Sequence, residues 1–363
     1  MSKLQVWVLY DGKPGHLSQS LGLAQQLSRH LDADIHTIKA KVAGPLRRLA
    51  LGLCRLPLMP ARLIAALYRM SLPKQAPDLV ISFGGKVVPL NAALAHRFSC
   101  ANILIGNRYG LSPALFNVLV NARSEGLANQ VVTQVPFCRQ MSRQLNAREQ
   151  LDLQALRFND AACWTLLIGG DGSGYSYTEQ DWQALVASMV QLADTHNIRW
   201  LVSTSRRTPQ WVEQLLETSD VQKRAEKVIL FNRQPESIKP LLLAGQRLFV
   251  TADSLSMLTE AISCDRPVVS VAPSHLDKAA SKVHQQTLGC YRDYKLLSET
   301  QISEIEQRVA QMLGEEAESS APFTSYSMLA DAAALQVLKT LQWQSVATQG
   351  VRHLEHSAVV LQG

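Results

Sequence analysis

The sequence predicts an α/β protein in which two doubly wound, Rossmann-like domains face each other across a cleft. Short apolar runs rich in β-branched residues alternate with helical patterns, and this alternation is typical of parallel sheets covered by helices. The alternation stops at a polar, charged stretch near 139–160, which we expect to be the linker between the domains, and then restarts. A chain of 363 residues also has the length expected of two domains.

Each element follows from the local pattern, because apolar runs of four to seven residues predict strands and longer 3.6-residue periods predict helices. In the first half we expect strands at 4–10, 35–39, 78–83 and 102–106, weaker strands near 116–120 and 130–133, and helices at 17–31, 45–70 and 87–98. In the second half we expect strands at 164–168, 199–203, 227–231, 248–251 and 268–272, and helices at 179–196, 209–217, 236–244, 254–264, 278–287, 299–313 and 326–342.

These elements define the expected domains. Residues 1–145 form an N-terminal Rossmann-like acceptor domain, and residues 160–325 form a C-terminal domain that binds a nucleotide-sugar. The helical stretch 326–345 could cross back to the first domain, and residues 346–363 form a tail. Ligands of open α/β sheets bind at the carboxyl ends of the strands, so the loops that follow the strands are the places to look for chemistry.

The composition favours an anionic partner. Hydrophobic residues make up 47% of the chain and charged residues 18%, as in a globular protein with a real core, and the formal charge is +6. Aromatic residues make up only 6% and do not alternate with basic ones, which argues against nucleic-acid binding. The six cysteines form no C-x-x-C pair, so we expect reduced thiols and no metal or redox cofactor.

The sequence also suggests where the protein resides. No secretory signal is visible, because the apolar run 4–10 is short and ends at Asp11, and no run is long enough to span a bilayer. We therefore expect a cytoplasmic protein that is at most peripheral on the inner face of the cell membrane. The D-x-D letters of Asp32 and Asp34 fall in an expected surface turn, so we predict no metal site.

A glycine-rich loop after the strand at 164–168 is the strongest local signal for phosphate binding. It comprises Gly169, Gly170, Asp171, Gly172, Ser173 and Gly174, and it leads to a helix with Thr178 as its expected N-cap. Glycines allow close backbone approach, and successive N–H groups can bind an oxyanion. The spacing is neither G-x-G-x-x-G nor that of a P-loop. The simpler alternative is a tight strand-to-helix turn.

A second anion site is expected where the strand at 248–251 enters the next helix. The residues at this junction are Asp253, Ser254, Ser256 and Met257, with Glu260 one turn further on. Free N–H groups and the positive end of the helix dipole make such a junction suitable for a diphosphate. Glu260 lies roughly 9 Å along the helix from Ser254, where a carboxylate could accept two hydrogen bonds from a ribose. The alternative is an ordinary N-cap at Asp253 and an exposed Glu.

A third candidate is the loop with Ser205, Arg206 and Arg207, which follows the strand at 199–203. Two arginines at the carboxyl end of a strand can bind phosphate through paired hydrogen bonds. Thr208 and Pro209 are expected at the N-cap and N1 positions of the following helix. The alternative is a solvated arginine pair.

The first half contains matching loops that could bind an acceptor. Asp11, Gly12, Lys13, Gly15 and His16 join the first strand to the first helix; Gly84, Gly85 and Lys86 follow the strand at 78–83; Asn107 and Arg108 follow the strand at 102–106. His16 could act as a general base near neutral pH, with Asp11 orienting it or taking the proton itself. The alternative is a histidine that merely caps the helix at the surface.

Taken together, these segments resemble the bacterial branch of the mitochondrial-fission ELM (elongated mitochondria) family, described as GT-B glycosyltransferases. The likeness covers about residues 5–340. It is carried by DGKPGH at 11–16 with the following QSLGLA at 19–24, SFGGK at 82–86, GGDGSGY at 169–175 with Trp182, TSRRTP at 204–209 and TADSLSMLTEA at 251–261. The eukaryotic members are associated with organelle division.

A more distant resemblance is to the transferase that adds N-acetylglucosamine to the lipid carrier of peptidoglycan. It implies that the Asp11–His16 loop and Gly84–Gly85 lie on the acceptor side, that Ser254–Ser256 bind the diphosphate and that Glu260 holds the ribose. The glycine-rich loop at 169–175 departs from that enzyme's pattern. We therefore expect a metal-independent, inverting transfer from a nucleotide-diphosphate sugar, with no cofactor, to a cell-envelope or lipid-linked acceptor.

Two other functions remain open. Tyr291 and Lys295 spell Y-x-x-x-K, as in NAD(P)-dependent nucleotide-sugar epimerases, but the glycine motif that such enzymes need after the first strand is missing. The chain could instead be a non-catalytic membrane-associated recruitment protein that keeps the family fold.

A basic segment favours contact with an anionic membrane. Between residues 35 and 77 there is no acidic residue but there are eight basic ones: Lys39, Lys41, Arg47, Arg48, Arg55, Arg62, Arg69 and Lys74. Four arginines, from Arg48 to Arg69, recur every seven residues and would share a helix face, although Pro57 and Pro60 divide the region into at least two helices. The pattern is typical of lipid-binding surfaces. The alternative is two sheet-covering helices with solvated arginines.

Overall fold

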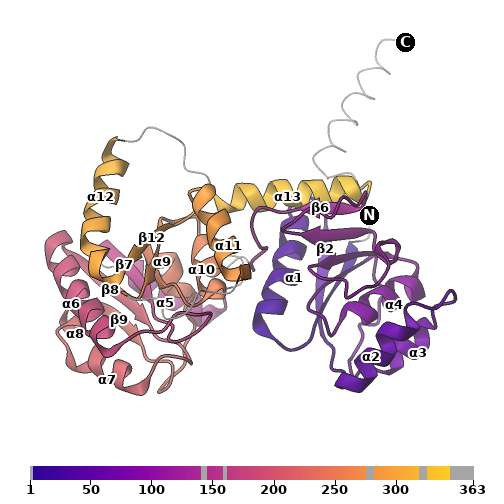
Figure 1. The fold of residues 1–363 in the computed structure, drawn as a ribbon, viewed down its shortest axis with the longest axis horizontal. Coiled ribbons are helices and arrows are strands. Elements are labelled where there is room, and N and C mark those ends of the chain that lie inside the picture. Colours follow the sequence, from indigo (N-terminus) through magenta and orange to yellow (C-terminus); the bar gives the residue numbers. More distant parts are fainter. Residues whose placement is uncertain (1–2, 140–144, 158–161, 275–281, 319–324, 344–363) are drawn as a thin grey trace, which may run out of the picture. The chain divides into compact units, whose positions relative to one another are not determined.

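The computed structural model describes residues 3–139, 145–157, 162–274, 282–318 and 325–343. The chain divides into two compact units (Figure 1). Unit 1 contains Met1–Arg139 and Met328–Gly363, and unit 2 contains Gln140–Ser327. The tail expected at 346–363 lies outside the described residues, as does the first part of the helix expected at 278–287.

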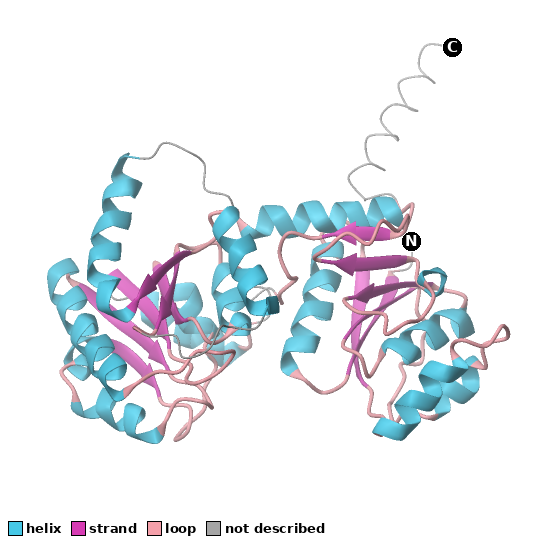
Figure 2. Ribbon diagram, in the orientation of Figure 1, coloured by secondary structure: helices cyan, strands magenta, loops and turns pink. Residues whose placement is uncertain are grey.

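Unit 1 is built on a six-stranded parallel sheet with the order β2-β1-β3-β4-β5-β6. The strands are β1 (Leu4–Tyr10), β2 (Ala33–Lys39), β3 (Leu79–Phe83), β4 (Ala101–Ile105), β5 (Val118–Asn121) and β6 (Gln130–Val132). β1, β3 and β4 read as continuous apolar runs because helices cover both of their faces. Figure 2 shows α1 (Pro14–Leu27) on one side of this sheet and α4 (Val88–Phe98) on the other.

The basic segment folds as two short helices, α2 (Gly44–Leu53) and α3 (Ala61–Ala66). Pro57 and Pro60 fall between them, as expected of residues that cannot continue a helix. Arg55 and Arg69 therefore lie outside any helix, and the predicted stacking of four arginines on one helix face is wrong. α3 packs on α4 and buries Ile64 completely, whereas α2 buries only Ala50.

Unit 2 repeats the architecture with the strand order β12-β11-β10-β7-β8-β9, again wholly parallel. The strands are β7 (Ala162–Leu167), β8 (Ile198–Ser203), β9 (Ala225–Ile229), β10 (Arg247–Thr251), β11 (Val268–Ala272) and β12 (Ser298–Gln301). Trp164, Trp200 and Phe249 from three of these strands pack together in the core, with ring centroids 5.4–6.0 Å apart. The prediction of two doubly wound parallel sheets is thus confirmed.

The helices of unit 2 are α5 (Ala147–Arg157), α6 (Glu179–His196), α7 (Gln210–Thr218), α8 (Val221–Arg224), α9 (Lys239–Ala244), α10 (Leu255–Ile262), α11 (Lys282–Asp293) and α12 (Ile305–Glu318). α6 begins as predicted, because Thr178 and Asp181 form a reciprocal capping box. Two predictions are wrong. Residues 147–157 form α5 where we expected a linker, and 298–301 form β12 where we expected a helix to begin.

The last helix, α13 (Tyr326–Thr340), begins in unit 2 and continues in unit 1. In unit 1 its Asp331 Oδ1 lies 2.9 Å from His30 Nε2 and 3.7 Å from Arg29 Nε. Within unit 1, the buried residues of α13 recur every three to four positions, as Ala330, Ala333, Ala334, Val337 and Leu338. In the part of the chain that the structure describes, no helix combines the length and the apolar character needed to cross a membrane.

Candidate functional site

In unit 1, a cavity of about 340 Å³ opens at the carboxyl ends of β1, β3 and β4. This position is where open parallel sheets bind ligands. The cavity is lined by side chains from four separate segments: Asp11, Lys13, His16, Arg47, Phe83, Gly84, Gly85, Lys86, Ile105, Asn107 and Tyr109. Three of these side chains are cationic, so the cavity suits a ligand that carries negative charge.

Asp11 and His16 form a hydrogen-bonded pair in this cavity. The Asp11 Oδ1 and His16 Nδ1 atoms lie 2.8 Å apart, and the backbone N–H of Lys13 donates to the same carboxylate oxygen at 3.3 Å. The Asp11 side chain is only 3% exposed, whereas that of His16 is 22% exposed. A carboxylate that accepts from Nδ1–H leaves Nε2 of the neutral ring as a proton acceptor. Within the pair, His16 is therefore better placed to act as a base, and Asp11 orients it.

Gly84 and Gly85 are required for the close packing of this cavity. Gly84 has φ +103°, and a Cβ there would collide with the His16 ring. A Cβ on Gly85 would collide with the Tyr109 ring. Phe83 packs edge-on against the His16 ring at a centroid distance of 4.9 Å. The absence of side chains at Gly84 and Gly85 thus leaves room for the His16 and Tyr109 rings to pack against the backbone.

In unit 2, a second cavity of about 380 Å³ opens at the carboxyl ends of β7, β8 and β10. It is lined by Leu167, Ser203, Thr204, Ser205, Arg206, Arg207, Phe231, Glu236, Ile238, Ser254, Ser256 and Met257. Six of these residues belong to the predicted nucleotide-sugar site. The cavity therefore brings together the arginine loop and the start of α10, which lie about fifty positions apart in the sequence.

The start of α10 faces this cavity without a side-chain cap. Ser254 is the N-cap residue, but its hydroxyl contacts the Ser256 hydroxyl at 3.2 Å instead of capping the backbone. The first N–H groups of a helix have no partner within the helix, and the helix dipole adds a partial positive charge. Ser254, Ser256 and Met257 thus line a region suited to an anion.

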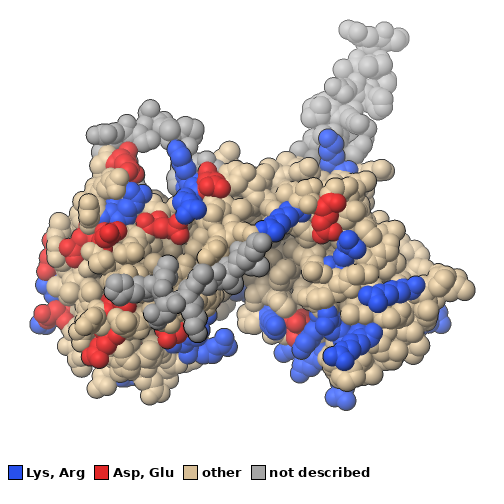
Figure 3. All heavy atoms as spheres, in the orientation of Figure 1, with Lys and Arg blue, Asp and Glu red and all other residues tan. Residues whose placement is uncertain are grey.

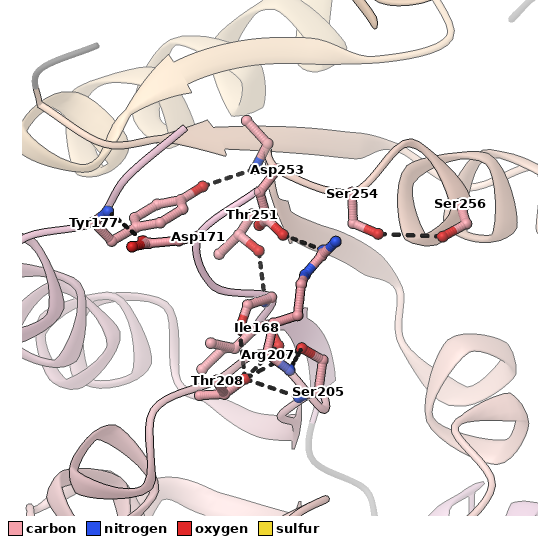
Figure 4. A network of polar contacts seen from close by, with 12 residues as sticks. Ile168, Asp171, Tyr177, Ser205, Arg207, Thr208, Thr251, Asp253, Ser254 and Ser256 are labelled. Atoms are coloured by element: carbon pink, nitrogen blue, oxygen red, sulfur yellow. Dashed lines mark hydrogen bonds and ion pairs between the residues drawn. The ribbon is translucent and has the colours of Figure 1, made fainter. Parts of the chain in front are cut away.

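Arg207 is held beside this region by a buried carboxylate. Its guanidinium pairs with Asp253 Oδ2, and Asp253 is completely buried (Figure 4). Burial raises the pKa of Asp253 to about 6, although the Thr251 hydroxyl and the Arg207 charge act in the opposite direction. Among the described residues, Asp253 Oδ1 has no hydrogen-bond partner. The N-cap of α10 is Ser254 and not Asp253. The simpler alternative for this junction, an ordinary N-cap at Asp253, is therefore wrong.

Comparisons with known proteins fit this geometry. The family model of mitochondrial fission ELM1 matches residues 14–334. The chain belongs to this family. No curated protein matches the ELM1-family chain in sequence.

Solved structures show which fold this member of the family shares. A candidate UDP-N-acetylglucosamine 2-epimerase from Listeria monocytogenes is 12% identical, with a TM-score of 0.55 over 93% of this chain and 96% of that one. The UDP-GlcNAc 2-epimerase from Methanocaldococcus jannaschii is also 12% identical, with a TM-score of 0.54 over 93% and 99%. MurG from Acinetobacter baumannii is 14% identical and aligns over 97% of this chain and 99% of that one, with a TM-score of 0.42. The fold of this chain is therefore of the GT-B type.

The glycine-rich loop of this chain differs from the predicted oxyanion cradle. The Gly169 N–H donates to Thr251 Oγ1 at 2.7 Å, and the Gly172 N–H donates to the Tyr175 carbonyl at 3.0 Å. These two amides are used within the protein, so the expectation of exposed N–H groups is wrong at both positions. The loop instead packs on Arg207, because a Cβ on Gly170 would collide with the Arg207 carbonyl.

Thr208 joins the glycine-rich loop to the arginine loop. Its hydroxyl contacts the carbonyls of Ile168 and Gly169 at 3.0 and 2.5 Å and accepts from the Ser205 N–H at 2.9 Å. The predicted N-cap role of Thr208 is wrong, since Pro209 takes that position in α7.

Several predicted site residues do not line either cavity. Gly169, Gly170, Asp171, Gly172, Ser173, Gly174, Asp253 and Glu260 lie outside the cavity of unit 2, and Gly12, Gly15 and Arg108 lie outside that of unit 1. Arg108 instead binds the Leu111 carbonyl at 2.8 Å and Glu125 at 3.2 Å. Gly12 has φ +93°, and a Cβ there would lie 3.0 Å from Lys39 Cε.

Sequence reasoning missed two groups of cavity residues. Arg47 reaches the cavity of unit 1 from α2, where its Nε donates to the Gly85 carbonyl at 2.9 Å and its guanidinium lies 4.6 Å from the centre of the Tyr109 ring. In unit 2 the cavity also includes Phe231, Glu236 and Ile238 from the segment after β9. Arg47 belonged to a segment that we read as a membrane surface, and no motif marks the other residues.

Two further candidates have ordinary structural explanations. Tyr291 of the Y-x-x-x-K pattern is completely buried, and its hydroxyl lies 2.6 Å from Thr259 Oγ1. It is therefore closed to a substrate. Asp34 lies on β2 and not in a turn, and both Asp32 and Asp34 lie within 4 Å of the Lys3 ammonium group.

Proposed function

We propose that this protein is a glycosyltransferase that moves a sugar from a nucleotide-diphosphate donor, bound in unit 2, to a cell-envelope or lipid-linked acceptor, bound in unit 1. One observation carries the proposal. The cavity of unit 2 combines an uncapped helix start, two arginines and an aromatic ring, Phe231, that is 38% exposed. A nucleoside diphosphate needs the same combination of positive charge for its phosphates and a flat apolar surface for its base.

The leaving nucleotide is stabilised by this chain's own groups in the proposed reaction. Negative charge develops on the diphosphate as the glycosidic bond breaks, and the start of α10 with Arg206 and Arg207 offers fixed positive charge to it. The scheme requires no metal ion. Glu236 is paired with Lys227 at 2.7 Å, so its negative charge is already balanced within the protein.

The acceptor hydroxyl is activated in unit 1. His16 Nε2 takes the proton of that hydroxyl, and Asp11 stabilises the resulting imidazolium. Direct attack by the acceptor on the donor sugar displaces the nucleotide in one step and inverts the anomeric carbon. Lys13, Arg47 and Lys86 favour an acceptor that carries negative charge near its reacting hydroxyl.

The proposal includes a cytoplasmic location with peripheral attachment to the inner face of the cell membrane. None of the six cysteines, all of which lie in the described part of the chain, forms a disulfide, as is usual in a reducing compartment. A lipid-linked acceptor would also have to be met at a membrane surface.

Calorimetric titration with nucleoside diphosphates and their sugars tests the donor site directly. We expect one base to give micromolar binding, and we expect Arg206→Ala to weaken that binding by about tenfold or more, because a charge-assisted hydrogen bond is lost. Arg148→Ala is the matched control, since that side chain is exposed in unit 2 away from the cavity. Absence of heat with every nucleotide would favour the recruitment function instead.

Product analysis separates transfer from the remaining alternative. Because two epimerases share this fold, epimerisation of the donor has to be tested. The protein is incubated with a nucleotide-sugar that it binds, and the donor is then analysed by NMR. An epimerised donor without an acceptor would contradict the transferase proposal. A thermal shift with NAD(P) but not with nucleotide-sugars would point to a dehydrogenase-type enzyme.

A further inference from the structure

An unusual number of exposed leucines lies on α2, α3 and the segment between them. Five of the large apolar side chains that are more than one-third exposed fall between residues 46 and 63: Leu46, Leu49, Leu56, Leu58 and Leu63. Leu58 is 90% exposed, the highest value among the described large apolar residues. Single exposed leucines need no explanation, but a group of them indicates a surface that is covered by a partner.

The same surface is basic. Arg48, Arg55 and Arg62 are exposed beside these leucines, and no acidic residue occurs between 35 and 77. Figure 3 shows Lys and Arg side chains gathered over the part of unit 1 that contains α2. We call residues 44–66 with these exposed leucines and arginines the α2–α3 face.

The packing of the two helices explains why the leucines are exposed. α2 buries only Ala50, so Leu46 and Leu49 contribute little to the core. α3 buries Ala61, Ile64 and Ala65 and turns Arg62 and Leu63 outward. The helices are therefore held by Ala50, Ala61, Ile64 and Ala65 on one side and present large apolar and cationic side chains on the other.

We propose that the α2–α3 face docks on an anionic phospholipid bilayer. The exposed leucines enter the boundary between headgroups and acyl chains, and the arginines bind lipid phosphates at the same depth. The absence of acidic residues argues for this occupant, because an anionic lipid surface complements an entirely cationic face. Docking of this kind is independent of any nucleotide chemistry.

The face also connects to the cavity of unit 1. Arg47 lies on α2 between exposed residues, yet its guanidinium reaches the cavity wall formed by Gly85 and Tyr109. Arg55 donates to the Tyr109 carbonyl at 3.4 Å. If the proposed transferase function holds, a lipid-linked acceptor could stay in the bilayer while its polar head enters this cavity.

Vesicle sedimentation tests the proposal with the full chain and without nucleotide, so its outcome does not depend on the transferase proposal. We expect the protein to sediment with phosphatidylglycerol–phosphatidylcholine vesicles and not with phosphatidylcholine alone, and we expect binding to weaken as salt is raised. The double variant Leu49→Glu with Leu58→Glu should weaken binding by about tenfold or more. Two inserted apolar side chains would become negatively charged and would be repelled by the negatively charged lipid. Arg48→Gln or Arg62→Gln should each weaken binding about fivefold.

Leu151→Glu with Leu335→Glu is the matched control, since these leucines are 61% and 43% exposed but lie outside the face. We expect this variant to bind like the unaltered protein. Equal loss in both double variants, or equal binding to neutral and anionic vesicles, would overturn the proposal. So would a dimer in solution that Leu49→Glu with Leu58→Glu dissociates, because the face would then serve a second copy of the chain.

Discussion

At the scale of single residues, the two titratable groups of the Asp11–His16 pair differ in burial and therefore in their expected roles. Asp11 has almost no contact with solvent and shares one oxygen between a backbone N–H and His16 Nδ1. A carboxylate held in this way fixes the tautomer and the orientation of the imidazole ring. His16 keeps an exposed edge in the cavity. The two residues therefore have different expected effects on catalysis.

We predict that His16→Ala lowers kcat about 10²- to 10⁴-fold, because the acceptor hydroxyl loses its base. Asp11→Asn should lower kcat as well and shift the pH profile, since an amide cannot stabilise the imidazolium. Both variants should bind the donor nucleotide normally, which calorimetry can check. Full turnover in His16→Ala would show that the pair is structural.

Asp253 gives a prediction about stability. Its pKa rises from 3.8 unfolded to about 6 in the native state, so the folded protein binds the proton more tightly. The contribution of this group to folding is therefore fully present below the unfolded pKa and is lost as the pH rises through about 6. By linkage the loss is about 3 kcal/mol, an upper estimate. Denaturant unfolding should show that Asp253→Asn gains stability relative to the unaltered protein between pH 4 and 7.

The control for this experiment is Asp220→Asn, because Asp220 is exposed and its pKa is lowered by Lys223. That substitution should not reproduce the gain. If the difference between Asp253→Asn and the unaltered protein were constant over the same pH range, Asp253 would not titrate there.

At the scale of elements, the junctions between strands and helices decide where the cavities form. The glycine-rich loop after β7, the arginine loop after β8 and the start of α10 after β10 are tied together by Thr208 and by Asp253 with Arg207. Glycine is needed at 169 and 170 because the Asp253 carboxylate and the Arg207 backbone approach the chain closely. The glycine-rich loop does not line the cavity itself but packs against Arg207, which does.

We predict that Gly170→Ala destabilises unit 2 by about 1–3 kcal/mol, because the methyl group would overlap the backbone of the arginine loop. It should also weaken nucleotide binding by moving Arg207. Gly314→Ala in α12 is the control, since a Cβ there meets nothing within 4 Å. The control should be neutral or stabilising, as expected for alanine in a helix. Thermal unfolding of both variants decides the matter.

Most elements could be predicted because their own residues specify them. Thr178 and Asp181 mark the start of α6, and the apolar runs of β1, β3 and β10 can form only buried strands. β12 was missed because Ser298–Gln301 carries no apolar pattern and is a strand only through pairing with β11 at the sheet edge. α5 was missed because its sequence is polar and shows no clear helical period. The helix is fixed by a tertiary contact, in which Glu149 binds Ser237 and Lys239.

At the scale of the whole molecule, α13 shows that the order of residues in the chain does not follow the division into units. The helix begins in unit 2, and from Met328 onward it belongs to unit 1. Its contact through Asp331 with His30 joins residues 301 positions apart. Unit 1 therefore needs both ends of the described chain to be complete.

We predict that Ala334→Asp destabilises the protein by several kcal/mol, because Ala334 is completely buried and a carboxylate there would lack partners. Leu335→Asp is the neighbouring control and should cost about 0.5 kcal/mol or less, since that side chain is 43% exposed. Urea unfolding measures both. Equal costs at the two positions would mean that α13 does not pack as described.

Periodicity, capping and glycine placement are local properties of the chain, so the amino-acid sequence is enough to predict the two parallel sheets, the family and the short motifs after the strands. Tertiary structure alone decided which of those motifs meet. It brought Arg47 into a cavity from a segment that we read as a surface, and it turned the glycine-rich loop inward onto Asp253 and Arg207. Such meetings depend on packing between residues far apart in the sequence, and no local pattern records which amide or carboxylate already has its partner.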